Sequence, residues 1–169
     1  PIGGILYGHF GDKIGRKKVL FISAILFIIS AIGFSFVEAY PLLIVFRVLA
    51  GMGVGAASNV SPLYISEVAP SNKRGRLVTY YQLAITLGVL AAYISNFYIQ
   101  QYAVSHVGDS AGLFDWLFVD QIWRGMFLVS LIPALVFFIL LIGVPESPRW
   151  LVQHGKNDMA LGILTKING

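Results

Sequence analysis

The chain of 169 residues is 57% hydrophobic and 12% charged, with a mean hydropathy of +0.77 and a formal net charge of +4. A typical soluble domain has about 25% charged residues, so this composition excludes an ordinary soluble protein and indicates a membrane protein. The chain contains no cysteine, which excludes disulfides, thiolate chemistry and cysteine-ligated metals.

The first residues contain the end of an apolar helix and a basic turn. Residues 1–10 are too short to cross a bilayer alone, and residues 11–18 carry four Lys or Arg side chains. Because the sequence starts inside an apolar run and without Met, we expect it to be part of a longer protein.

Four later segments are long and apolar enough to span a bilayer. The first contains three serines as its only polar side chains and would form about 28 Å of helix, the thickness of a hydrocarbon core. The fourth contains Pro133, which a packed membrane helix tolerates. We expect a turn, a polar loop and a long irregular loop to join them. The predicted spans are residues 19–37, 42–65, 77–98 and 123–144, and the predicted connections are residues 38–41, 66–76 and 100–121.

The second predicted span contains a face of small and polar residues. Arg47, Gly51, Gly55 and Asn59 are four residues apart, so they share one side of a helix. Small residues at this spacing let helix backbones approach closely, and the polar residues beside them are costly against lipid. We therefore expect this face to point toward protein or a watery cavity.

The third predicted span contains a polar stripe. Its members recur at helical spacings, with Val89 as the one apolar residue among them, so we expect the stripe to face the interior of the bundle. The polar members are Thr79, Gln82, Thr86, Tyr93 and Asn96.

The last 25 residues are more polar. Ser147 is predicted to cap a short helix with Pro148 at its first position, Gly155 to end that helix, and Asn157 to cap the next one. The final helix has an apolar face that suits either the membrane side of the protein or a soluble domain. This face comprises Met159, Ala160, Ile163, Leu164 and Ile167.

The basic residues predict the orientation. Ten of the twelve Lys and Arg residues fall in residues 11–18, residues 66–76 and the segment after Val144. By the positive-inside rule these three regions are cytoplasmic, and Arg47 and Arg124 lie at outer helix ends. The positive charge is therefore explained by membrane topology, and we expect no nucleic acid partner.

Three motifs resemble signatures of the major facilitator superfamily. GHFGDKIGRK at residues 8–17 resembles the conserved turn of that superfamily. PLYISEVAP at residues 62–70, followed by Arg74 and Gly75, and PESPRWL at residues 145–151 resemble the signatures of its sugar porters after the fourth and sixth helices. Within the sugar porters, the sequence is most similar to the bacterial D-xylose:proton symporters, and the facilitative glucose transporters are more distant.

This resemblance implies an all-α, polytopic membrane protein that forms a partial N-terminal six-helix half of a transporter. Residues 1–144 would hold part of helix 2 and helices 3 to 6, and residues 145–169 would begin the cytoplasmic helical linker. The missing C-terminal half of the same chain and the lipid bilayer of the cell inner (plasma) membrane would be its partners.

The resemblance also assigns binding roles. Gln82 matches the family glutamine that hydrogen-bonds sugar hydroxyls, and a neutral amide suits a polyol because it both donates and accepts. A hydrogen bond between helices is the alternative role. The D-xylose symporters have a second glutamine where this chain has Val89, and in this respect the chain resembles the facilitators instead.

Arg47 matches the arginine that neighbours an aspartate on helix 1 in proton-coupled members. Facilitators share this arginine, so it does not by itself indicate coupling, and anchoring at the membrane interface is the alternative. Six charged residues match the cytoplasmic network that latches the two halves together, although single members could be solvated loop charges. They are Asp12, Arg16, Glu67, Arg74, Glu146 and Arg149.

The implied function is transport of a monosaccharide, a pentose or hexose such as D-xylose or D-glucose, by alternating access with proton symport. An uncoupled facilitator and a transporter-like sugar sensor are the alternatives. We expect no enzyme activity, cofactor or metal, because the spans contain no cluster of acids or histidines and His9, His106 and His154 lie on separate elements.

Overall fold

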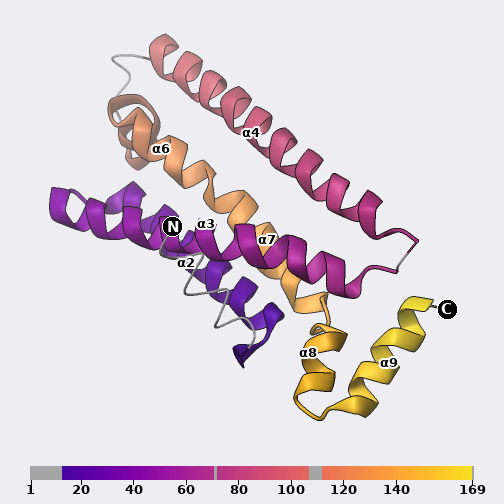
Figure 1. Ribbon diagram of the computed structural model, residues 1–169. Coiled ribbons are helices and arrows are strands. Elements are labelled where there is room, and N and C mark those ends of the chain that lie inside the picture. Colours follow the sequence, from indigo (N-terminus) through magenta and orange to yellow (C-terminus); the bar gives the residue numbers. More distant parts are fainter. Residues whose placement is uncertain (1–12, 71, 107–111, 169) are drawn as a thin grey trace.

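A computed structural model describes residues 13–70, 72–106 and 112–168, and within these ranges the chain forms helices and no strand (Figure 1). The prediction of an all-α membrane protein is therefore confirmed. The elements are α2 (Arg16–Phe36), α3 (Tyr40–Val68), α4 (Arg74–Ser105), α5 (Leu113–Asp115), the π-helix η1 (Trp116–Asp120), α6 (Ile122–Val129), α7 (Leu131–Gly143), α8 (Pro148–Gln153) and α9 (Asn157–Asn168).

Four helical segments of the described residues are long and apolar enough to cross a membrane: α2, α3, α4 and the α6–α7 pair. They correspond to the four predicted spans. The predicted polar loop at residues 66–76 is shorter than expected, because α3 continues to Val68 and α4 begins at Arg74.

The prediction of a long loop at residues 100–121 is wrong for the described residues, 100–106 and 112–121, most of which are helical. Helix α4 continues to Ser105, and α5 and η1 follow. Tyr102 of α4 meets Phe114 edge-on with ring centroids 6.1 Å apart, and Phe114 stacks on Phe118 at 4.7 Å. These aromatic contacts favour helical backbone here, since a helix satisfies its own polar groups while its side chains pack.

The fourth span is interrupted at Ser130, between α6 and α7. Pro133 has no N–H and cannot donate to the carbonyl of Val129 four residues earlier. At the break the backbone forms a tighter turn with hydrogen bonds between residues three apart. The Ser130 backbone N–H donates to Phe127 O at 3.2 Å, and the Ser130 hydroxyl donates to the same oxygen at 2.6 Å. The proline predicted to be tolerated is accommodated by this break.

Helix α2 is the centre of the bundle and contacts α3, α6 and α7. Gly53 allows α3 to approach closely, since a Cβ there would lie 3.3 Å from Ser23 O of α2. Ala56 and Val60 continue this buried face of α3. The face of α3 that packs on α2 is therefore not the predicted face that contains Gly51. No described atom lies within 4 Å of a Cβ built on Gly51.

Helix α4 runs along one side of the bundle (Figure 1) and contacts α3, α6 and η1. Of its side chains only Ala103 is buried. Most of the remaining surface of α4 is exposed among the described residues; in the predicted polar stripe Asn96 is partly buried and the other members are exposed.

The two short helices at the end of the chain form a hairpin. Ser147 caps α8 by accepting from Trp150 N, Pro148 is in its first turn, and Gly155 follows it with φ +72°, as predicted. Asn157 is the first residue of α9 rather than its cap. Helix α9 packs Ala160 and Ile163 against α8, whereas Met159 of the predicted apolar face is exposed.

Candidate functional site

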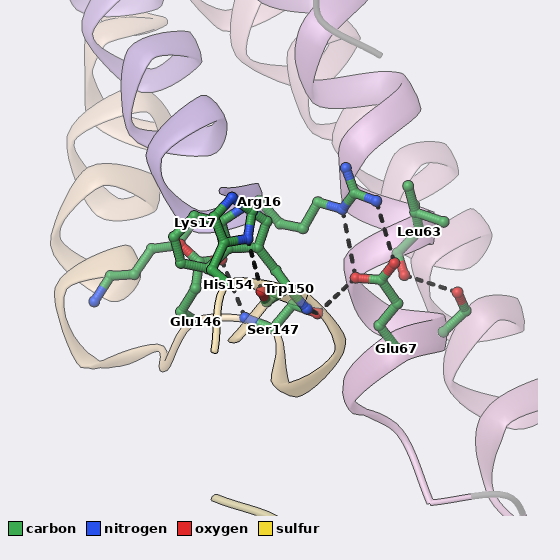
Figure 2. A network of polar contacts seen from close by, with 9 residues as sticks. Arg16, Lys17, Leu63, Glu67, Glu146, Ser147, Trp150 and His154 are labelled. Atoms are coloured by element: carbon green, nitrogen blue, oxygen red, sulfur yellow. Dashed lines mark hydrogen bonds and ion pairs between the residues drawn. The ribbon is translucent and has the colours of Figure 1, made fainter. Parts of the chain in front are cut away.

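Polar side chains gather at the end of the bundle where α2 and α8 begin and α3 ends (Figure 2). We call this group the polar cluster. It consists of Arg16, Lys17, Glu67, Glu146 and Ser147.

Arg16 and Glu67 form a buried ion pair between α2 and α3. Nε of Arg16 donates to Oε2 of Glu67 at 3.4 Å and Nη2 donates to Oε1 at 3.3 Å. The two side chains are only 8% and 4% exposed. Such a pair fixes the two helix ends firmly, because breaking a buried ion pair by removing one charge is strongly destabilising.

Ser147 connects this pair to α8. Its hydroxyl donates to Oε2 of Glu67 at 2.6 Å and accepts from the backbone N–H of Trp150 at 3.4 Å. One buried hydroxyl therefore caps α8 and binds the carboxylate at the end of α3 (Figure 2).

Glu146 lies at the N-terminus of α2. Its Oε1 accepts from the backbone N–H of Lys17 at 2.9 Å and from that of Ser147 at 3.1 Å. A carboxylate is favourable at this position because the first N–H groups of a helix are unpaired and carry partial positive charge. Gly15, with φ +110°, provides the space, since a Cβ there would lie 2.5 Å from Glu146 Oε2.

Two further contacts were not predicted from the sequence. The Tyr64 hydroxyl donates to Pro145 O at 2.7 Å, and Lys17 Nζ donates to Ile142 O at 3.2 Å near the end of α7. Tyr64 follows Val60 by four residues, so helical spacing could have placed it on the face of α3 that packs on α2. Nothing in the sequence around Lys17 indicates its carbonyl partner.

The polar cluster thus brings together three of the six predicted network residues: Arg16, Glu67 and Glu146. Asp12 lies outside the described residues. Arg74 and Arg149 are exposed, and among the described residues neither side chain has a hydrogen bond or an ion pair. The two arginines remain available to groups beyond the described part of the chain.

The two residues predicted to act within the membrane lie on different helices. Gln82 is exposed on α4, where its backbone carbonyl accepts from the Thr86 hydroxyl at 3.2 Å. Arg47 is exposed on α3 and lines a largely apolar cavity of about 380 Å³ between α2, α3 and the α6–α7 pair. Ser30, whose buried hydroxyl lacks a partner in the described part of the chain, lines the same cavity.

A family model described as "Sugar (and other) transporter" matches residues 1–169. The chain is 41% identical to a D-xylose-proton symporter of Escherichia coli (strain K12), with 99% of this chain and 36% of the symporter covered. It is 42% identical to a glucose transport protein of Synechocystis sp., with 99% of this chain and 35% of that protein covered.

Similarity extends to solved structures. The proton:xylose symporter XylE bound to 6-bromo-6-deoxy-D-glucose matches with a TM-score of 0.84 and 40% identity, over 99% of this chain and 37% of that one. This chain therefore spans little more than a third of the length of these relatives. Both relatives are transporters, and the four candidate membrane spans agree with a multi-pass membrane protein. Because the family model matches residues 1–169, the chain belongs to the sugar transporter family.

Proposed function

We propose that this chain forms most of one half of a transporter that moves a monosaccharide across a membrane by alternating access, coupled to protons. The observation that carries the proposal is the polar cluster, which joins the ends of three membrane helices to α8 in a chain of this family. Residues 1–144 would form the membrane part of the N-terminal half, and residues 145–169 would begin the cytoplasmic linker.

The charges at this end of the bundle suit a two-state switch. The buried pair of Arg16 and Glu67 holds the half together as a rigid unit. Arg74 and Arg149 are exposed, so they can pair with the opposite half in one state and return to water in the other at little cost. In this proposal the buried charges maintain the unit and the exposed ones form the latch.

Gln82 is the proposed sugar ligand on this half. Helix α4 leaves its polar stripe open toward the space where a second half would lie, and an amide can donate to one hydroxyl while it accepts from another. A site between two halves near the middle of the membrane is the usual arrangement for transporters of this kind.

Proton coupling rests on the names of the relatives and on Arg47. The D-xylose-proton symporter compared above by sequence and by structure is proton-coupled, and Arg47 is exposed toward the cavity, where it could neighbour a carboxylate from another helix. An arginine favours the ionised carboxylate, so protonation would weaken the pair and release the helices. Uncoupled facilitation is the second candidate, because the chain has Val89 in place of the second glutamine of the D-xylose symporters and in this respect resembles the facilitative glucose transporters.

The proposed orientation places residues 11–18, residues 66–76 and the segment after Val144 in the cytoplasm, in a plasma membrane. The polar cluster would then be cytoplasmic. No bond chemistry is required of any residue, because transport needs only binding and rearrangement.

Uptake into liposomes tests the proposal. The full-length protein that contains this chain would be reconstituted, and labelled D-xylose and D-glucose would be supplied with and without an inward proton gradient. Accumulation that requires the gradient supports symport, and equilibration that ignores it supports the facilitator. Absence of uptake of either sugar would contradict the proposal and favour a sensor.

A further inference from the structure

At the end of the bundle opposite the polar cluster, a second arginine is buried. Arg124 of α6 is only 5% exposed and contacts α2 and η1. We propose that Arg124 is a positioning residue that fixes this end of α4 relative to α2. We call the four residues involved the Arg124 clasp: Ser35, Trp116, Trp123 and Arg124.

The clasp joins α6 to the last turn of α2 in both directions. Nη1 of Arg124 donates to the backbone carbonyl of Ser35 at 3.4 Å, and the Ser35 hydroxyl, which donates to Ala31 O at 2.9 Å within α2, shares its proton with the carbonyl of Arg124 at 3.3 Å. Carbonyls in the last turn of a helix lack helical partners and carry partial negative charge, so a cation there is favourable.

Two tryptophans hold the guanidinium by its faces. Cζ of Arg124 lies 4.8 Å from the ring centroid of Trp116 and 4.8 Å from that of Trp123. Its Nε has no hydrogen-bond partner in the described part of the chain. The site therefore favours a broad, planar cation that lies over two rings at once, and lysine, although it keeps the charge, offers only a compact ammonium.

Aromatic contacts carry the constraint from the clasp to α4. Beside Arg124, Gly125 leaves room for η1 to lie directly on α6, since a Cβ there would be 2.7 Å from a ring carbon of Phe118. Phe118 stacks on Phe114, and Phe114 meets Tyr102 of α4. Because only Ala103 of α4 is buried, this route contributes strongly to where that end of α4 lies, beside the direct contacts of α4 with α3 and α6.

Helix α4 also carries Gln82, so the clasp would affect sugar affinity, and this part of the inference rests on the proposed function. A change at the clasp alters the position of α4 without touching the sugar. Mutations at such remote positions typically change binding about 3-fold or more.

The experiment measures distances between spin labels in the full-length protein, free of other cysteines. One pair replaces Ile32 of α2 and Val104 of α4, which are both exposed at the clasp end. A second pair at Lys18 and Val78 reports on the opposite end. The variants are Arg124→Gln, Arg124→Lys and Trp116→Ala, and the matched control is Arg76→Gln, which removes an exposed arginine that lies over Tyr80 within α4.

We expect the three clasp variants to shift and broaden the distance at the clasp end only, and Arg76→Gln to change neither distance. Arg124→Lys keeps the charge for membrane insertion, so it carries the test if Arg124→Gln fails to fold. An unchanged distance in folded Arg124→Lys and Trp116→Ala would overturn the proposal. Sugar binding by the unmodified protein is measured by calorimetry; its absence would contradict the proposed function while the distances still decide on the clasp.

Discussion

The Ser147 hydroxyl donates a hydrogen bond of 2.6 Å to Glu67, whose carboxylate also accepts two hydrogen bonds from Arg16. The Glu67 carboxylate thus accepts hydrogen bonds both from the first residue of α2 and from the residue that caps α8. Replacement of Glu67 by Ala would break this buried ion pair, at a cost of about 3–5 kcal/mol. We expect a clearly lower unfolding temperature in detergent, and the exposed Glu38→Ala variant, measured in parallel, should match the unmodified protein.

Ser147→Ala removes a smaller contribution. The variant loses the cap of α8 and one hydrogen bond to a charged group, so we expect a loss of about 1–3 kcal/mol of stability. Thermal unfolding measures it. Ser66→Ala is the control, because the Ser66 hydroxyl only donates to Leu63 O within α3. Equal effects of the two substitutions would show that the bond to Glu67 contributes nothing.

Gly15→Ala should displace Glu146. The new Cβ would lie 2.5 Å from Oε2 of Glu146, and a φ of +110° is itself unfavourable for alanine. We expect a loss of more than about 1 kcal/mol, because both strain and the bond to Lys17 N are affected. Gly143→Ala, with no atom within 4 Å of its Cβ, is the control. If both variants unfold at one temperature, the close approach of Glu146 is not important.

Gln82→Ala should weaken sugar binding by the full-length protein about 10-fold, the value of one lost hydrogen bond to a neutral hydroxyl. Expression and unfolding temperature should not change, because Gln82 is exposed. Calorimetry gives the dissociation constant. Leu83→Ala, an exposed neighbour, serves as the control, and unaltered affinity in Gln82→Ala would remove this glutamine from the site.

Arg74→Ala should shift the full-length protein toward its inward-open state. In the proposed function its exposed charge pairs with the other half in one state only, so its removal would destabilise that state. Spin-label distances across the two halves on the cytoplasmic side would report the shift. Lys73→Ala is the adjacent exposed control. Identical distance distributions in Arg74→Ala and the unmodified protein would argue against the latch.

Hydropathy was sufficient to predict the four spans, because about twenty apolar residues in a row have few alternatives to a membrane helix. It was insufficient at residues 100–121, where Tyr102, Phe114 and Phe118 stabilise helical backbone through contacts that no local pattern reveals. The same holds at Ser130, since the position of a proline predicts that a helix is disturbed but not how the neighbouring hydroxyl responds.

The polar cluster, too, could be predicted only in part from the sequence. The motifs predicted six network charges, of which three lie in the polar cluster, yet the pairing of Arg16 with Glu67, 51 residues away, depends on how closely α3 approaches α2 at Gly53. Capping of α8 by Ser147 is local and was predicted correctly. Its bond to Glu67 required the tertiary structure. The roles of Gln82 and Arg47 remain predictions.

The close packing of α2 on α3 has a consequence for the biogenesis of the protein. Only three residues separate these helices, and most of the core between them comes from α2 and α3 themselves, with Leu141, Phe137 and Phe138 of α7 added later. They can therefore form a stable hairpin soon after both have entered the bilayer. Helix α4, with almost all its surface uncovered, must wait for later segments, so the nascent protein is most exposed to quality control after α4 has been inserted.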